Sequence, residues 1–275
     1  KAVVIVFSPS GHTLAAARMI RKSIEARGGA ADIVDLTKDD TLLFSPVGSE
    51  NLAAKAGEFD ALFVGAPVYA GHAEHTVLRT IAMLPPPDER RSKIAVPFIS
   101  YGGAHSFVAL EEMARALKKK KYVPVQGIKL ASFHTLSRYF HNKILPDKPG
   151  DAEALLIDRA VSKVFDICAH KNAIRDNSVS FAYAKAPMRF ILRMLPQEKI
   201  HARFKTVSVL REKCGGCKRC VAVCPVNNVA FSEGKASITA KNAEVAAVLD
   251  EIERLKHEME VRSKASASSG TAKKK

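Results

Sequence analysis

Apolar runs of strand length alternate with amphipathic stretches over the first 170 residues. The runs that predict buried strands are 2–7, 31–36, 61–65, 94–100 and 127–132. The stretches whose apolar residues recur every three to four positions predict helices at 13–27, 75–83, 106–121 and 151–170. Strands that alternate with helices predict an α/β domain, in which a parallel sheet carries helices on both faces.

Five such units fit a doubly wound five-stranded parallel sheet with the strand order 2-1-3-4-5. In this arrangement a ligand binds beyond the carboxyl ends of the strands, so the loops after strands one, three and four would line the site. Pro97 is unusual in a central strand because it lacks a backbone N–H, and we therefore expect it near the entry of its strand.

The pattern changes after the predicted sheet, and it divides the chain into further segments. Residues 1–172 are predicted to form the α/β domain and 173–206 a basic connector with a short helix near 188–195. The cysteine-rich segment spans 207–238. Residues 239–262 contain an amphipathic stretch that predicts a terminal helix, and 263–275 are predicted to be a disordered basic tail.

The loop after the first strand has the composition of a phosphate-binding turn. It reads Ser8-Pro9-Ser10-Gly11-His12-Thr13, with three hydroxyl side chains and a glycine just before a predicted helix. The first N–H groups of a helix have no partner within the helix, and the helix dipole favours an anion there. The loop contains no Lys, so it does not fit the nucleotide-binding pattern that requires one. A turn that only caps the helix remains the alternative.

Two further loops carry a tyrosine among small residues at the same predicted edge of the sheet. After the third strand comes Gly65-Ala66-Pro67-Val68-Tyr69-Ala70-Gly71, and after the fourth comes Ser100-Tyr101-Gly102-Gly103-Ala104-His105. Tyrosine can stack on a flat ring system, and glycine allows the backbone to approach it closely. The alternative is that both tyrosines pack at the sheet edge while the glycines form turns.

The first loop resembles the flavodoxin fingerprint that wraps the phosphate of FMN, with Ser10 in place of the usual Thr. Residues 3–170, including Pro67 and Pro97, resemble the flavodoxin domain of a family of flavodoxin–ferredoxin fusion proteins. This resemblance implies a flavodoxin-like fold and FMN contacts at the three loops. The FMN-binding residues expected on this basis are Ser8, Ser10, Gly11, His12, Thr13, Pro67, Val68, Tyr69, Ala70, Gly71, Ser100, Tyr101, Gly102 and Gly103.

Four of the five cysteines form a C-x2-C-x2-C-x3-C-P run. Its members are Cys214, Cys217, Cys220 and Cys224, followed by Pro225. This spacing is typical of bacterial ferredoxins that hold a 4Fe-4S cluster, whereas zinc sites usually use two separated pairs. Cys168 lies alone on the apolar stripe of a predicted helix, which favours a core thiol over a ligand.

The cysteine run differs from the family pattern because no second run follows it. In two-cluster ferredoxins the fourth cysteine of such a run serves the other cluster, but this chain has no Cys after Cys224. Three outcomes are open. Cys224 completes a 4Fe-4S cluster; the site holds a 3Fe-4S cluster or takes an outside ligand; or the segment no longer binds iron.

The charge and the absence of long apolar runs limit the remaining possibilities. The formal net charge is +15, but no aromatic residues interleave the basic runs, so we expect no nucleic-acid binding. We expect instead a redox protein partner with an acidic surface. No apolar run is long enough to span a membrane, and a cytoplasmic protein is the default expectation.

The sequence therefore predicts an electron-transfer flavoprotein that passes electrons between FMN, an iron–sulfur centre and a partner. Two alternatives belong to other classes. One is an FMN-dependent quinone or NAD(P)H oxidoreductase, which requires an open cavity over the flavin. The other is a binding protein that has kept the flavodoxin fold and has a degenerate cluster site.

Overall fold

The computed structural model describes residues 1–43, 45, 47–139, 141–170, 179–195, 197–201 and 208–239. The chain divides into two compact units, one comprising 1–43 and 47–207 and the other 44–46 and 208–275. The terminal helix expected within 239–262 and the tail expected at 263–275 lie outside the described residues, apart from Thr239. No helix among the described residues is long and apolar enough to cross a membrane.

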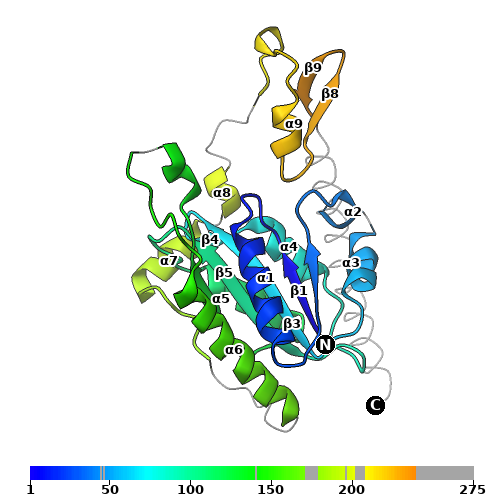
Figure 1. The fold of residues 1–275 in the computed structure, drawn as a ribbon, viewed down its shortest axis with the longest axis vertical. Helices are drawn as coiled ribbons and strands as arrows, with labels where there is room; N and C mark the ends of the chain where they lie inside the picture. Colours follow the sequence, from blue (N-terminus) through cyan, green and yellow to red (C-terminus); the bar gives the residue numbers. More distant parts are fainter. Residues whose placement is uncertain are drawn as a thin grey trace, which may run out of the picture. The chain divides into compact units, whose positions relative to one another are not determined.

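The first unit is built on a mainly parallel sheet with helices on both faces (Figure 1). Its strands are β1 (Ala2–Val6), β2 (Ala31–Asp35), β3 (Ala61–Tyr69), β4 (His72–Ala73), β5 (Ile94–Tyr101), β6 (Val123–Pro124) and β7 (Ile128–Ala131). Its helices are α1 (His12–Glu25), α2 (Asp40–Leu43), α3 (Gly48–Ala56), α4 (His75–Met83), α5 (Ala109–Lys119), η1 (Thr135–Tyr139), α6 (Asp151–Ala169), α7 (Ala186–Met194) and α8 (Gln197–His201).

The five expected strands are β1, β2, β3, β5 and β7, and their spatial order is β2-β1-β3-β5-β7. This is the predicted doubly wound order, and the fold is flavodoxin-like. Two details differ from the prediction. The sheet has seven strands, because β6 forms a separate short pairing with β5, and β4 pairs antiparallel with the end of β3.

The core follows from the alternation of side chains along the central strands. Val4 and Val6 of β1 face a cluster that includes Ile20 of α1 and Val161 of α6. The intervening Val3 and Ile5 are equally buried, as expected for a strand covered on both faces. On the other face, α4 packs against both α5 and β3.

Pro97 lies in the middle of β5, opposite Val64, and not near the strand's entry as expected. The structure explains how it is accommodated. The carbonyl oxygen of Ala95 accepts a hydrogen bond from the N–H of Val125, just after β6. Backbone groups two residues apart in a strand point the same way, so the backbone of Pro97 also faces the neighbouring strand on that side. The offset between paired residues is 29 for Ala95↔Pro124 (124 − 95) and 30 for Phe98↔Ile128 (128 − 98). The neighbouring strand therefore carries one extra residue there, and the missing N–H of Pro97 falls at this bulge.

Other boundaries needed correction. The strand predicted at 61–65 continues to Tyr69, because β4 pairs with Val68 and Tyr69 to form a hairpin. The helix predicted at 106–121 begins only at Ala109, and the helix near 188–195 runs from Ala186 to Met194. Helices α2 and α3 were not predicted.

The second unit contains the cysteine run. Its described elements are η3 (Arg211–Lys213), α9 (Arg219–Val223), β8 (Val229–Ser232) and β9 (Lys235–Ile238). Strands β8 and β9 form an antiparallel pair joined by a turn at Glu233 and Gly234, both of which have positive φ angles.

Candidate functional site

The loop between β1 and α1 is held in shape by its own hydrogen bonds. Ser8 is buried, and its hydroxyl accepts a bond from the backbone N–H of Leu14 at 2.9 Å. Its backbone N–H donates to the hydroxyl of Thr37 at 2.9 Å. The N–H of Gly11 donates to the carbonyl of Ser8 at 3.1 Å, and Gly11 has a φ of 84° at the helix start. Ser8 thus organises the turn from within.

The same loop presents backbone donors that the described part of the chain does not use. The N–H groups of Ser10, His12 and Thr13 have no hydrogen-bond acceptor among the described residues. Ser10 and Gly11 are exposed, and no atom lies within 4 Å of the position that a Cβ on Gly11 would take. Unpaired amides at an open helix N-terminus are suited to an anion.

A hydroxyl pair joins this loop to the end of β5. The side chains of Thr13 and Ser100 are both buried, and their oxygens lie 2.7 Å apart. Because one of the two hydroxyl hydrogens forms this bond, the other remains available to donate to a ligand. The pair holds the first loop against the loop after β5, as the predicted topology requires.

The hairpin of β3 and β4 forms a second wall of this edge. Pro67 is buried, Val68 is half-buried, and Tyr69 is 39% exposed at the end of the strand. Burial, with a smaller contribution from the charge of Glu74, raises the pKa of Tyr69 to about 12, so its hydroxyl stays protonated. Ala70 and Gly71 form the turn, with φ angles of 51° and 86°.

The loop after β5 forms the third wall. Tyr101 is half-buried, and the ammonium of Lys129 lies 4.6 Å from its ring centroid. Gly102 and Gly103 follow, and a Cβ on Gly102 would lie 2.4 Å from the ring of His134. Gly65, the last residue of the predicted strand, lies inside β3, which continues beyond it to Tyr69. A Cβ on Gly65 would lie 2.1 Å from the ring of Phe98, so its role is packing.

A fourth loop, which the sequence analysis missed, lies at the same edge of the sheet. It follows β7 and brings Phe133 to within 5.8 Å of the ring of His12, measured between centroids. His134 lies against Gly102, and Leu145 lies against Gly103. The signal that could have identified this loop is the position of Phe133 and His134 directly after the fifth strand.

Two histidines at this edge have a buried ring nitrogen without a hydrogen-bond partner in the described part of the chain. They are Nε2 of His72 and Nδ1 of His134. His72 lies on β4, and its other nitrogen is 2.7 Å from the carboxylate of Glu112. A buried polar atom without a partner is unusual in a folded protein, and a bound ligand or water can satisfy it.

His12 of the first loop also lies at this edge. Burial lowers its pKa, and the positive charge of Arg138 lowers it further. Its imidazole is therefore neutral near pH 7, so that it can donate or accept one hydrogen bond beside the loop.

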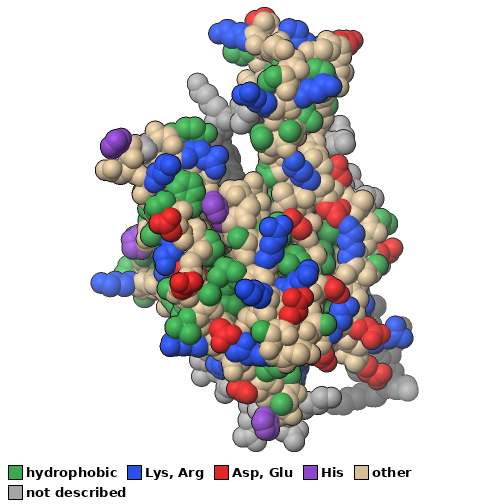
Figure 2. Space-filling view, in the orientation of Figure 1, with side chains coloured by type: hydrophobic (Ala, Val, Ile, Leu, Met, Phe, Trp, Pro, Cys, Tyr) green, Lys and Arg blue, Asp and Glu red, His purple; other side chains and the backbone are tan. Residues whose placement is uncertain are grey.

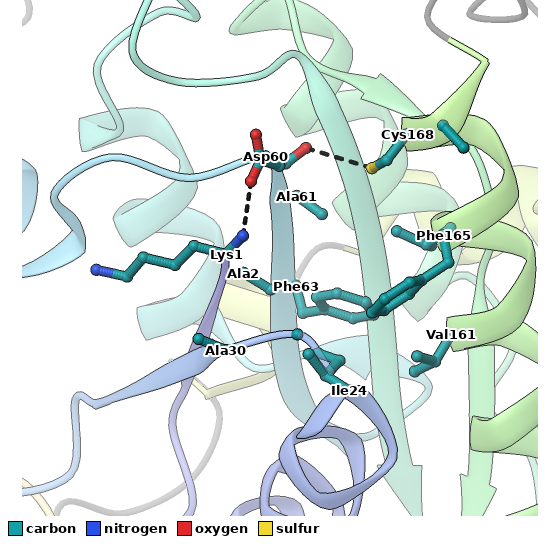
Figure 3. Close-up of a pocket in the computed structure, with 13 residues that line it drawn as sticks. Lys1, Ala2, Ile24, Ala30, Asp60, Ala61, Phe63, Val161, Phe165 and Cys168 are labelled. Atoms are coloured by element: carbon teal, nitrogen blue, oxygen red, sulfur yellow. Dashed lines mark hydrogen bonds and ion pairs between the residues drawn. The ribbon is translucent and has the colours of Figure 1, made fainter. Parts of the chain in front are cut away.

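The cavity shown in Figure 3 lies at the opposite edge of the sheet. It has a volume of about 360 Å³ and is lined mainly by apolar side chains, among them Phe63, Val161 and Phe165. Lys1 and Asp60 lie at the amino ends of β1 and β3, so this cavity is separate from the four loops. Cys168 also lines it, and burial raises the pKa of this thiol.

In the second unit, two of the four thiols already accept bonds from backbone N–H groups. Cys214 Sγ accepts from Ala236 at 3.4 Å, and Cys224 Sγ accepts from Asn228 at 3.2 Å. The pKa of Cys214 is lowered mainly by hydrogen bonds from the backbone N–H groups of Ala236 and Gly216. The positive charges of Lys235 and Arg211 lower it further. Such bonds stabilise a thiolate, which is the form that binds a metal.

The other two thiols are accessible. Cys217 and Cys220 are exposed, and all four cysteines of the run are free thiols. Gly216 has a φ of 72°, and a Cβ there would lie 3.0 Å from the carbonyl oxygen of Gly234, so glycine is needed to fold the loop over the hairpin. Within the described residues, no three His, Cys, Asp or Glu side chains already surround a site for a metal ion.

Comparison with known protein families assigns the cysteine segment. Residues 207–229 match the model of the 4Fe-4S binding domain. The match contains all four cysteines of the run. The chain therefore combines a flavodoxin-like domain with a ferredoxin-like 4Fe-4S segment.

The flavodoxin-like unit is similar to several solved structures. Rubredoxin oxygen:oxidoreductase from Desulfovibrio gigas is 17% identical, with a TM-score of 0.43, and covers 62% of this chain. The match spans only 37% of the length of that oxidoreductase. An archaeal flavodoxin is 18% identical over 62% of this chain and 100% of its own, with a TM-score of 0.38. Flavodoxin 1 from Bacillus cereus is 16% identical over 60% and 98%, with a TM-score of 0.41. No curated protein matches the chain.

Proposed function

We propose that this protein is an electron-transfer flavoprotein that binds FMN at the carboxyl edge of its sheet and a 4Fe-4S cluster at its cysteine run. The observation that carries the proposal is the loop at the head of α1. It leaves the N–H groups of Ser10, His12 and Thr13 without an acceptor among the described residues, beside two loops that each carry a tyrosine.

The phosphate of FMN would occupy the turn formed by Ser10 to Thr13. Backbone N–H groups and the helix dipole suit a dianion, so no lysine is required. The hydroxyl of exposed Ser10 and the free hydrogen of the Thr13–Ser100 pair would add donors. The hydroxyl of Ser8 is buried and accepts a bond from the N–H of Leu14, and its own hydrogen would remain available to donate to the phosphate.

The isoalloxazine ring would lie between Tyr69 and Tyr101. Tyr69 still exposes 39% of its surface, and its hydroxyl remains neutral, so it can supply a flat apolar wall. Gly102 and Gly103 would allow the backbone to approach the ring edge. The unpaired nitrogen of His134 is a candidate donor or acceptor for that edge.

FMN supplies one- and two-electron transfer, and the cluster supplies one-electron transfer. The protein's own residues would hold each group and adjust its potential. At the cluster, the N–H bonds to Cys214 and Cys224 would stabilise thiolate ligands. Cys224 would be the fourth ligand, because it completes the C-x2-C-x2-C-x3-C run and its thiol already accepts an N–H bond of the kind that stabilises a thiolate.

The partner we propose is a redox protein with an acidic surface. The chain carries a net charge of +15, which favours association with negative surfaces. On the face shown in Figure 2, Lys and Arg side chains are intermixed with Asp and Glu over the first unit. The attraction would therefore be spread over the surface. We also propose a reducing compartment such as the cytoplasm, because the four cluster thiols must remain unpaired.

The experiment that tests this function is an anaerobic absorbance spectrum of the purified full chain, with flavin and iron assays. We expect flavin bands together with broad iron–sulfur absorption, and about four iron atoms for each flavin. Flavin bands without iron would overturn the two-centre function and leave a flavin carrier. A colourless protein that FMN and iron cannot reconstitute would favour the binding-protein alternative.

A further inference from the structure

Within the first unit, helix α7 is attached to α5 by its charged side, and its apolar side faces outward. None of its residues is buried, although Phe190, Ile191 and Met194 are large and apolar. Their exposed fractions are 67%, 49% and 60%. This is the reverse of the usual arrangement, in which the apolar face of a surface helix packs on the core.

The attachment is made by one carboxylate. Glu111 of α5 accepts bonds from Arg189 at 2.8 and 2.9 Å, and it also binds Arg193. Arg115, one turn further along α5, donates to the same carboxylate at 2.8 Å. Both arginines of α7 therefore turn toward α5, and they fix which face of the helix points away from it.

The outward face is wide and continuous. At 100° for each residue, Phe190, Met194, Ile191, Leu195 and Met188 follow one another around the helix, while the two arginines occupy a narrow strip opposite. Met188 is 40% exposed and Leu195 is 36% exposed. A contiguous exposed apolar surface of this kind marks an interaction site.

The charge around this face indicates its partner. The described residues 185–195 and 197–201 contain four Lys or Arg residues and one Glu, and two of the four, Arg189 and Arg193, bind Glu111. Lys185 and Lys199, on either side of the helix, are exposed. Projecting Phe, Ile and Met side chains with flanking cations match an interfacial helix, which inserts its apolar face among acyl chains while cations contact anionic head groups.

We propose that α7 is a docking surface for an anionic lipid bilayer, which would hold the chain at the membrane surface without spanning it. The proposal does not depend on whether the chain binds FMN or a cluster. It follows from an apolar helix face that the fold presents outward and from the cations beside it.

Flotation of the full chain with lipid vesicles tests this proposal. We expect binding to vesicles of mixed phosphatidylglycerol and phosphatidylcholine, weaker binding to phosphatidylcholine alone, and a decrease with salt. The double variant F190S/M194S should reduce the partition coefficient by at least about tenfold, because each large side chain contributes substantially when it leaves water. Both positions are exposed, so the fold should be retained.

The matched control is L155S/L156S on α6. Leu155 and Leu156 are exposed by 52% and 46%, and they lie on a helix with acidic residues in its first turn. This control should bind vesicles like the unchanged protein. No flotation with anionic vesicles, or equal losses in both double variants, would overturn the proposal. A dimer in sedimentation velocity that F190S/M194S abolishes would also overturn it, because a second copy would then cover the face.

Discussion

At the scale of single residues, the phosphate turn depends on the backbone of Gly11. Its φ of 84° lies in the left-handed region, where a Cβ is unfavourable, yet no atom lies within 4 Å of that Cβ position. Glycine is therefore required at position 11 because of the backbone conformation, although there is room for a larger side chain. A substitution there would move the neighbouring N–H groups of Ser10 and His12, which are the proposed phosphate donors.

We expect Gly11→Ala to lower the free energy of unfolding by about 1 kcal/mol and to weaken FMN binding at least tenfold. Gly28→Ala is the matched control, since Gly28 has a φ of 75°, is equally open and lies at the far end of α1. It should lower stability to the same extent without changing affinity. Urea denaturation and flavin titration measure the two effects. Equal FMN affinity in both variants would contradict the placement of the phosphate.

The expected site residues of the first loop and of β5 differ in exposure and in hydrogen bonding. Ser10 and Gly11 are exposed at the expected loop and His12 is half-buried, whereas Ser8 is buried and Thr13 and Ser100 bind each other. The sequence shows that these side chains carry hydroxyl groups, but it does not show which hydroxyls form hydrogen bonds within the protein and which remain free for a ligand. Gly65 lies in a strand as predicted, but the reason that a glycine is needed there, the close ring of Phe98, comes from a neighbouring strand and could not be predicted.

At the scale of elements, the strand order was predictable because apolar runs and helical periodicity both pointed to it. The ends of the elements were not. The continuation of β3 to Tyr69 depends on pairing with β4, and the place of Pro97 depends on a bulge in the neighbouring strand. Both are contacts between segments that a local pattern does not contain. The loop after β7 was missed for the same reason.

The attachment of α7 predicts a particular dependence of stability on pH. The hydrogen bonds from Arg189 are the largest cause that lowers the pKa of Glu111 to about 2, from an ordinary value of 4.5. The folded carboxylate therefore releases its proton more readily than the unfolded one. Its contribution to stability is present above pH 4.5 and is lost as the pH falls toward 2.

We expect the Glu111→Gln variant to lack this contribution. The difference in unfolding free energy between the unchanged protein and the variant should be largest above pH 5 and should shrink between pH 4.5 and 2. Urea denaturation of both proteins at several pH values in this range measures the difference. Because the other carboxylates are the same in both proteins, their contributions cancel when one unfolding free energy is subtracted from the other. Glu25→Gln is a control, because its ion pair with Arg21 is exposed. A difference that does not vary with pH would show that Glu111 is not ionised against α7.

At the scale of the whole molecule, one chain combines the proposed sites for two cofactors. The four cysteines of the run lie in the second unit, and Cys168 lies in the first, where it lines the cavity at the amino edge of the sheet. The raised pKa of Cys168 keeps it a neutral thiol, which is a poor metal ligand. The two kinds of cysteine should therefore respond differently to substitution.

We expect Cys217→Ser or Cys220→Ser to remove the iron–sulfur absorption while FMN stays bound, because each variant removes one of the closely spaced thiolates proposed to hold the cluster. Cys224→Ser should lower the iron content toward that of a three-iron cluster. Cys168→Ser, the control, should leave the iron content unchanged. Iron assay and absorbance of the anaerobically purified variants measure these outcomes, and full iron content in Cys224→Ser would exclude it as a ligand.

The proposed function depends on FMN binding at the carboxyl edge of the sheet through the backbone of the first loop. Titration of the ¹⁵N-labelled chain with FMN, followed by amide NMR, is the sharpest test. We expect saturating shifts at Ser10, Gly11, His12 and Thr13, with further shifts at Tyr69, Tyr101 and Gly102. Shifts confined to Ala2, Ala61 and Cys168, at the opposite edge, or no shifts at all, would contradict it.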